Sequence, residues 1–371
     1  MNKINTLRLF VVLNILLGSC AYASSMHSDD ETRGGAASAR PATWELLTSE
    51  DTIHVVHPAS GLSFKQPQDR AAWDSQLNTA VREHGLKGGI TTHLETVDFK
   101  ALTGYFHPAN TEEERAAALK ACWDDPKVKA IQWARGGFGG SETLALLYDA
   151  GHRPERQIPV FGFSDATAYH LYYPDQPFFH APMAATNSES LPFLDIGNKN
   201  SSLKPMVDIL MGNLPEVSYN LSVCHLGAGI PITSFIVGGN MSVVFRHNGT
   251  PQQLKADGGI LFLEDFGDEL CYRSASVFFT AAIRTGVINR STKALFLGKM
   301  PRLIETESTA ADAIKTRLAK SGLSHIPILY SDGFGHGDVN GILPFKTPAV
   351  VEFSKNSDDK TTATITIQTR K

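Results

Sequence analysis

Apolar residues recur with two different periods along this chain, and the balance between them changes near its middle. From about residue 44 to residue 185, short apolar runs alternate with stretches in which apolar positions recur every three to four residues. This alternation predicts a parallel, doubly wound α/β sheet, in which functional groups collect at the carboxyl ends of the strands. The expected strands are 52–56, 128–134 and 158–162, and the expected helices are 70–84, 110–123, 141–148 and 166–172.

The second half of the chain is dominated by short strand patterns. A stretch around residues 192–202, rich in Asn, Lys, Ser and Gly, interrupts the periodicity and predicts the crossover between two domains. One helical pattern, Ser274–Thr285, ends at Gly286. We therefore expect a mixed, β-rich domain with few helices. Its predicted strands are 232–237, 259–263, 293–297, 326–330, 349–353 and 362–368.

Residues 1–23 carry their features in the order typical of a secretory signal. Lys3 and Arg8 provide the positive start, and the apolar run that follows is too short to span a bilayer as a helix. Two processing sites stay open: cleavage after residue 23, or a lipobox in which Cys20 becomes a lipidated N-terminus. Residues 24–43 are rich in Ser, Ala, Gly and charge and predict a flexible linker. Export is therefore expected, with membrane contact only if Cys20 is lipidated.

Charge and cysteine content narrow the function classes. The net charge is −4 over 371 residues, and neither basic nor acidic residues form a long run, which argues against nucleic acid or a membrane surface as partner. After export, Cys122, Cys224 and Cys271 would remain. Their spacing matches no metal motif and their number is odd, so three buried thiols are expected, with one disulfide left open.

The sharpest local motif is Gly162-Phe163-Ser164-Asp165-Ala166, at a predicted turn from strand to helix. A serine at such a turn is lifted clear of the sheet, beside backbone N–H groups that can receive an oxyanion during acyl transfer. Ala166 stands where the nucleophile-elbow motif has its last glycine. The competing interpretation is a serine that only caps the helix.

A glycine-rich loop, Arg135–Gly140, follows the preceding strand. Its glycines allow close backbone approach to a ligand, and Gly137 is the best candidate for a second oxyanion donor. A phosphate loop is disfavoured because no Lys-Ser or Lys-Thr follows and the G-x-G-x-x-G spacing is not matched.

A serine nucleophile needs a base and an acceptor that orients the base. Among thirteen histidines, His336 lies in a glycine-flanked loop directly after a predicted strand. Glu264 ends the apolar strand 259–263, again at a carboxyl terminus. The order serine, acid, histidine is one that hydrolases use.

Taken together, these motifs resemble the LD-carboxypeptidase family of serine peptidases, which includes murein tetrapeptide carboxypeptidases and the microcin C immunity peptidases. The matching segments occur in the family's order and cover most of the chain from about residue 50 to 350. They are Pro58-Ala59-Ser60, Arg115, Arg135–Gly139, Gly162–Ala168, His180–Met183, Gly238-Gly239-Asn240, Leu263–Asp265, Tyr272-Arg273 and Gly335-His336.

The resemblance implies a role for each residue of the site. Ser164 would be the nucleophile, His336 the general base and then acid, and Glu264 the group that orients His336. Backbone N–H groups of Gly137 and Asp165 would form the oxyanion hole. No metal or organic cofactor is expected.

The resemblance also implies a fold and a substrate. A Rossmann-like N-terminal domain at residues 44–190 would precede a smaller β-rich domain at residues 205–371, and two chains would pair as a homodimer. The substrate would be a muropeptide tetrapeptide that loses its terminal D-Ala, and Arg135 or Arg273 would bind the substrate carboxylate. Because most relatives are cytoplasmic, the signal sequence points to peptidoglycan trimming in the periplasm.

Some positions depart from the family pattern, and two other functions stay open. Ala275-Ser276 replaces an acidic-basic pair, Lys346 replaces a glycine near Pro344, and Ala181 is more often glycine. One alternative is a microcin-C-type amidase acting on peptidyl-nucleotides, although the segment between Ser164 and Glu264 contains no Trp to stack a base. The other is a peptidoglycan-binding protein without activity.

Overall fold

The computed structural model describes residues 43–61, 67–93, 109–184, 203–266, 272–300, 307–337, 339–355 and 357–370. The expected signal, nearly all of the linker and the 192–202 crossover lie outside these ranges. Residues from Pro41 onward group into one compact unit. Within the described ranges, no helix is both long and apolar enough to cross a membrane.

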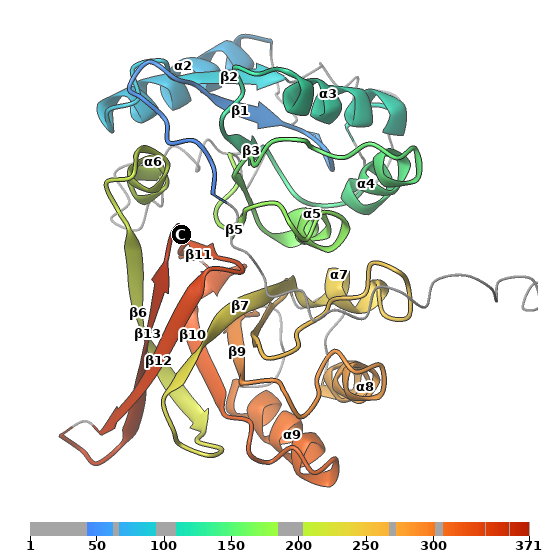
Figure 1. The fold of residues 1–371 in the computed structure, drawn as a ribbon, viewed down its shortest axis with the longest axis vertical. Coiled ribbons are helices and arrows are strands. Elements are labelled where there is room, and N and C mark those ends of the chain that lie inside the picture. The colour runs from blue at the N-terminus through green and yellow to red at the C-terminus, as the bar shows by residue number, and fades with distance from the viewer. Residues whose placement is uncertain are drawn as a thin grey trace, which may run out of the picture. The chain divides into compact units, whose positions relative to one another are not determined.

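The N-terminal half forms a six-stranded sheet in the order β11-β5-β4-β3-β1-β2 (Figure 1). Strands β1 to β5 pair in parallel, so the expected α/β architecture is confirmed. All residues of β1, β3, β4 and β5 are buried, which is why most residues in these strands are apolar. Their bounds are β1 Ile53–Val56, β2 Ile90–His93, β3 Ile131–Trp133, β4 Val160–Gly162, β5 Phe178–His180 and β11 Leu343–Pro344.

Helices follow the strands in the alternation that the sequence predicts. Thr111 begins α3 with a capping box: its Oγ1 accepts from the Glu114 N–H, and the Glu114 carboxylate accepts from the Thr111 N–H. In Figure 1, α3, α4 and α5 lie on one side of the strands, and α6 lies on the other. The bounds are α2 Pro67–Glu83, α3 Glu112–Asp124, α4 Gly140–Asp149, α5 Thr167–Tyr172 and α6 Leu203–Met211.

The C-terminal half closes a barrel in the order β10-β6-β13-β12-β7-β8-β9. Its strands β7, β8, β9 and β10 pair in parallel and the remaining neighbours pair antiparallel. The expected β-rich domain is therefore confirmed. Its elements are β6 Glu216–His225, β7 Ile232–Asn240, α7 Met241–Arg246, β8 Ile260–Glu264, α8 Tyr272–Arg284, β9 Ala294–Lys299, α9 Glu307–Lys320, β10 Ile328–Gly335, β12 Pro348–Lys355 and β13 Thr361–Gln368.

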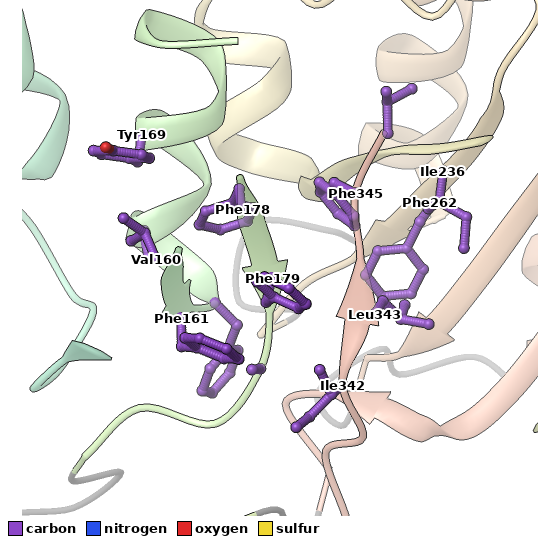
Figure 2. Close-up of a cluster of buried hydrophobic side chains, with 14 of the residues drawn as sticks. Val160, Phe161, Tyr169, Phe178, Phe179, Ile236, Phe262, Ile342, Leu343 and Phe345 are labelled. Atoms are coloured by element: carbon purple, nitrogen blue, oxygen red, sulfur yellow. The ribbon is translucent and has the colours of Figure 1, made fainter. Parts of the chain in front are cut away.

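A short segment after β10 joins the two halves. β11 pairs with β5 of the first sheet, the Phe345 N–H donates to the Phe178 carbonyl, and the Lys346 N–H donates to the Ile236 carbonyl of the barrel. Figure 2 shows the aromatic cluster around this segment, where Phe345 lies between Phe178 and Phe262, with ring centroids 5.5 and 6.4 Å away. Both sheets therefore share one continuous apolar core.

The expectation of three buried thiols is wrong for one cysteine. Cys122 is buried in α3 and is free, whereas Cys224 is exposed on β6. The strand β6 turns alternate residues to solvent, and Cys224 lies on its exposed face. Cys271 lies outside the described residues.

Candidate active site

Ser164 occupies a strained turn between β4 and α5. Its φ is +59°, in the left-handed region that non-glycine residues rarely adopt. Gly162 makes the turn possible, because a Cβ there would lie 2.7 Å from the Ala166 Cβ. Ser164 caps neither the short 3₁₀ turn that it starts nor α5, whose N-cap positions are Phe163 and Ala166. The turn therefore has the geometry of a nucleophile elbow rather than of a capped helix.

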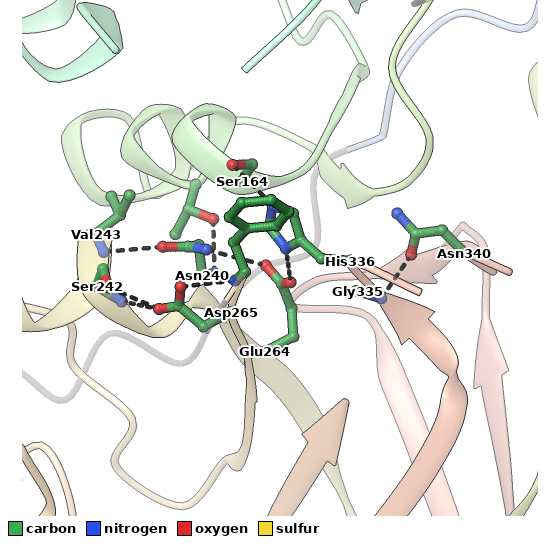
Figure 3. A network of polar contacts seen from close by, with 11 residues as sticks. Ser164, Asn240, Ser242, Val243, Glu264, Asp265, Gly335, His336 and Asn340 are labelled. Carbon is green, nitrogen blue, oxygen red and sulfur yellow. Dashed lines mark hydrogen bonds and ion pairs between the residues drawn. The ribbon is translucent and has the colours of Figure 1, made fainter. Parts of the chain in front are cut away.

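The structure brings His336 and Glu264 to Ser164, from strand ends of the barrel (Figure 3). His336 Nε2 lies 3.2 Å from Ser164 Oγ, and His336 Nδ1 lies 2.5 Å from Glu264 Oε2. Glu264 ends β8 and is fully buried, whereas the His336 side chain is 14% exposed. The three residues form a continuous line of hydrogen bonds from a hydroxyl to a buried carboxylate.

Neighbouring negative charge sets the protonation of His336. Burial opposes the charged imidazolium, but the Glu264 carboxylate and, more weakly, Asp265 outweigh it and raise the pKa of His336 above its ordinary value. Phe163 and Phe266 pack against the ring, with centroids 4.9 and 5.4 Å away. The carboxylates therefore favour the charged imidazolium, and the aromatic contacts orient the ring.

A second set of hydrogen bonds positions Glu264 and the neighbouring Asp265 at the end of β8. Asn240 donates to Glu264 Oε1 through Nδ2 at 3.4 Å, while its Oδ1 caps α7 at the Val243 N–H. Asp265 accepts from both the N–H and the hydroxyl of Ser242, at 2.8 and 2.7 Å. The start of α7 is thereby tied to the end of β8, as Figure 3 shows.

The glycine-rich loop borders the nucleophile. A Cβ on Gly136 would lie 3.2 Å from Ser164 Oγ and 3.3 Å from the Asp165 amide nitrogen. Gly137 has φ +103°, and a Cβ there would lie 2.3 Å from Ser60 Oγ. Gly137 therefore requires glycine, and a side chain at Gly136 would crowd Ser164, so the backbone of this loop approaches Ser164 Oγ closely.

Buried polar side chains fix the loop in place. Arg115 donates through Nε to Thr143 Oγ1 at 2.8 Å, and its Nη2 reaches the Gly139 carbonyl at 3.4 Å. The Asp165 carboxylate accepts from the Gly140 N–H at 2.6 Å, which links the start of α4 to the serine turn. Burial raises the pKa of Asp165 to about 7, against the lowering effect of the Gly140 bond.

A cavity of about 830 Å³ opens beside Ser164 and is lined by both basic and acidic side chains. Arg135 lines it and donates to the Gly61 carbonyl at 3.3 Å; burial lowers its pKa. Arg246 and Glu142 line it too. Exposed aromatic rings of Phe138 and Phe266 complete its wall.

Sequence reasoning located most of these residues but not all. Of the two suggested carboxylate-binding residues, Arg135 reaches the cavity, while the side chain of Arg273 lies outside the described part of α8. Arg246 and Glu142 were not foreseen. Arg246 could have been found, because it ends the short helix that follows Gly238-Gly239-Asn240.

Comparison with known proteins places the chain in a family. The family model for the LD-carboxypeptidase N-terminal domain matches residues 53–180, and the model for the LD-carboxypeptidase C-terminal domain matches residues 233–351. A murein tetrapeptide carboxypeptidase of Pseudomonas aeruginosa is 25% identical over 323 residues, which cover 84% of this chain and 95% of the relative. A probable murein peptide carboxypeptidase of Bacillus subtilis is 29% identical over 233 residues, 61% of this chain and 65% of the relative.

Solved structures share the fold. The muramoyltetrapeptide carboxypeptidase from Oxalobacter formigenes superposes with a TM-score of 0.61 at 22% identity, covering 85% of this chain and 98% of that one. The wild-type apo microcin C7 self-immunity protein gives 0.63 at 17% identity, covering 88% and 98%. Together with the two domain matches, these likenesses show that the chain belongs to the LD-carboxypeptidase family of serine peptidases.

Proposed function

We propose that this protein is an exported LD-carboxypeptidase that releases the terminal D-Ala from peptidoglycan tetrapeptides. The observation that carries the proposal is the hydrogen-bonded line of Ser164, His336 and Glu264 at the edge of a cavity with charges of both signs. The murein carboxypeptidases among the relatives support the substrate class.

In the proposed first step, His336 Nε2 takes the Ser164 hydroxyl proton as Oγ attacks the carbonyl carbon before D-Ala. Glu264 stabilises the imidazolium that forms. His336 then gives this proton to the amine nitrogen of D-Ala, the C–N bond breaks, and an ester to Ser164 remains.

A water molecule releases the ester in the second step. His336 accepts a proton from the water while its oxygen attacks the ester carbonyl, and the proton returns to Ser164 Oγ as the C–O bond breaks. The free tripeptide and D-Ala are the products, and the enzyme regains its starting protonation.

The oxyanion of both steps would be received by the N–H groups of Gly137 and Asp165. Support comes from the closeness of the glycine loop to Ser164 Oγ and to the Asp165 amide. Two such donors contribute roughly 3–4 kcal/mol each to transition-state stabilisation in hydrolases of this type.

The cavity charges suit a peptide with free charged ends. Arg135 and Arg246 would bind carboxylates, of which a tetrapeptide with diaminopimelate offers one on D-Ala and one on the diaminopimelate side chain. Glu142 would bind the side-chain ammonium. A lysine-containing peptide lacks the second carboxylate, so Arg246→Ala should lower kcat/KM more for the diaminopimelate peptide than for the lysine peptide.

The first experiment measures D-Ala release from diaminopimelate tetrapeptide by purified protein, beside Ser164→Ala and the matched control Ser141→Ala, which alters a cavity serine outside the line of hydrogen bonds. Release by wild type and Ser141→Ala, with none by Ser164→Ala, supports the proposal. No release by the folded wild type, or equal release by Ser164→Ala, contradicts it.

An amidase acting on peptidyl-nucleotides is the second candidate. Its support is the exposed pair Phe138 and Phe266 at the cavity, which are 43% and 39% exposed and could stack on a base. Phe138→Ala should then abolish cleavage of a peptidyl-adenylate analogue, whereas D-Ala release should fall little. Cleavage of the nucleotide substrate in preference to the tetrapeptide would favour the amidase.

Export rests on the sequence of residues 1–23 and requires its own test. Fractionation of cells and N-terminal mass analysis should find the protein outside the cytosol, beginning at Ser24 or at a lipidated Cys20. Cys20→Ala distinguishes the two, since it removes an anchor but leaves cleavage after residue 23 possible. An intact N-terminus on a cytosolic protein would contradict export.

We also propose a homodimer, on the resemblance to the family alone. Light scattering of the purified protein measures this directly. A mass of about 40 kDa, that of one chain, at micromolar concentration would contradict it.

A further inference from the structure

Three side chains that commonly bind metals meet on the face of the first sheet that α3 covers. His54 lies in β1, His93 ends β2, and Cys122 lies near the end of α3. Within the described residues, their ligand atoms all lie within 4.8 Å of one another. None of the three lines the cavity beside Ser164, and β3 separates β1 from β4 in the sheet.

The two histidines are already aligned. His54 Nδ1 lies 2.7 Å from His93 Nε2, and their rings are nearly parallel, 18° apart. Thr52 Oγ1 lies 3.2 Å from His54 Nε2 and can accept its hydrogen. In that tautomer His54 Nδ1 has no hydrogen, and its lone pair points toward His93. Histidines that bind metals through one ring nitrogen are commonly oriented in this way by a hydrogen bond from the other ring nitrogen.

The electrostatic surroundings favour a cation. Burial lowers the pKa of His54 to about 4 and also lowers that of His93, so both rings are neutral at pH 7, the form that binds metals. Asp125 is the negative group that acts on all three residues. Cys122 also lies at the negative end of the α3 dipole.

Cys122 is the side chain whose protonation must change when a metal binds. Burial raises the pKa of Cys122 to about 12, so the free side chain keeps its hydrogen at neutral pH. A bound cation deprotonates a coordinating thiol outright. Imidazole and thiolate together are ligands that Zn²⁺ accepts in tetrahedral sites.

We propose that His54, His93 and Cys122 bind Zn²⁺ at a site distinct from the active site, with a water molecule as the fourth ligand. On binding, Cys122 releases one proton to solvent and the hydrogen of His93 Nε2 moves to its Nδ1. The remaining positive charge is offset by Asp125. In a tetrahedral zinc site two ligand nitrogens are about 3.3 Å apart, so the rings separate by only about 0.6 Å.

The site would join elements that are distant in the sequence. The ion ties the edge strand β2 to β1 and to α3, and it can enter from solvent because His93 is only half-buried. Binding to the folded state alone stabilises it by mass action. Loss of zinc should therefore lower Tm without changing the residues that contact substrate.

The test uses the full purified chain after removal of metal. Zn²⁺ binding is measured by competition with a chromophoric chelator, and Co²⁺ is added separately to observe a thiolate-to-cobalt absorption band. The variants are Cys122→Ser and His93→Gln, with Cys224→Ser as the matched control, since it alters a cysteine that is exposed on the barrel, away from the two histidines.

The proposal predicts one Zn²⁺ per chain, a cobalt-thiolate band, and at least tenfold weaker binding for Cys122→Ser and His93→Gln, with Cys224→Ser unchanged. Circular dichroism confirms that each variant is folded, and the half-buried His93 serves if Cys122→Ser does not fold. No binding by wild type, or equal binding by wild type and His93→Gln, overturns it. The readout is independent of D-Ala release, so it does not depend on the proposed function.

Discussion

The first sheet and the barrel supply the active site in different ways. The sheet supplies Ser164 through backbone geometry: a left-handed φ, a glycine two residues before it, and a glycine loop in contact with it. The barrel supplies Glu264 and His336 through charge, with a fully buried carboxylate that raises the pKa of its partner. Changes in the barrel should therefore alter pH dependence, and changes in the sheet should alter rate at every pH.

The largest expected effect comes from removing the base. In the proposed mechanism, His336→Ala lowers kcat by about 10⁴-fold or more, because no group then accepts the Ser164 proton. The double variant His336→Ala/Glu264→Ala should be no slower than His336→Ala, since the two residues act as one unit. Steady-state kinetics on the tetrapeptide measure both. Additive losses would mean that Glu264 acts separately from His336.

Neutralising the acid should be nearly as severe and should change the pH profile. Glu264→Gln is expected to lower kcat by about 10³–10⁴-fold. In the proposed mechanism the wild type needs neutral His336, and because the pKa of His336 is raised above its ordinary value, kcat/KM should fall as pH drops through that raised pKa. Glu264→Gln removes the charge that raises this pKa, so the acidic limb should move to lower pH. If the acidic limb of the kcat/KM profile does not move, the group that titrates there is not His336.

Gly238, in strand β7 of the barrel, tests how much close packing between neighbouring strands contributes to stability. A Cβ on Gly238 would lie 1.9 Å from the Phe262 carbonyl oxygen, at φ +128°. Gly238→Ala should lower the free energy of unfolding by more than about 3 kcal/mol. The control Gly151→Ala also has positive φ but meets no atom within 4 Å, so about 1 kcal/mol is expected. Denaturant unfolding of both variants gives the comparison, and equal losses would show that φ alone matters.

A smaller effect, when measured per pH unit, concerns His180, which is fully buried against Phe163. Burial, with the nearby charge of His336, lowers the pKa of His180 to about 3, although the neighbouring Asn340 side chain acts to raise it. The unfolded chain therefore takes up a proton near pH 6.5 that the folded chain does not. This group should lower the free energy of unfolding by about 1.4 kcal/mol per pH unit as pH drops from 6.5 toward 3. His180→Phe should flatten this slope in unfolding curves; an unchanged slope would mean that His180 is charged when folded.

The strand-to-helix turns that position Ser164 and the glycine loop could be read from the sequence, because local motifs of glycine and serine determine them. The barrel strand β6 was missed although Val217, Tyr219, Leu221 and Val223 alternate along it; the polar residues between them resemble a loop. Helix α9 was missed as well, despite apolar residues at 311, 314 and 318.

Other features depend on contacts between distant segments, which no local pattern encodes. The pairing of β11 with β5 brings two residues of the C-terminal half into the first sheet. Lys346 follows it with φ +58°, which gives a physical reason for the glycine that the family usually has there. The meeting of His54, His93 and Cys122 likewise arises only when β2 and α3 are placed beside β1.

Acid-quenched intact-mass spectrometry during turnover tests the central claim most directly. With tetrapeptide as substrate, the account predicts an adduct equal to the tetrapeptide minus D-Ala, located on Ser164 by peptide mapping, and neither adduct nor D-Ala release in Ser164→Ala. Release of D-Ala that persists in Ser164→Ala would contradict the account, because the carbonyl would then be attacked by a group other than this serine.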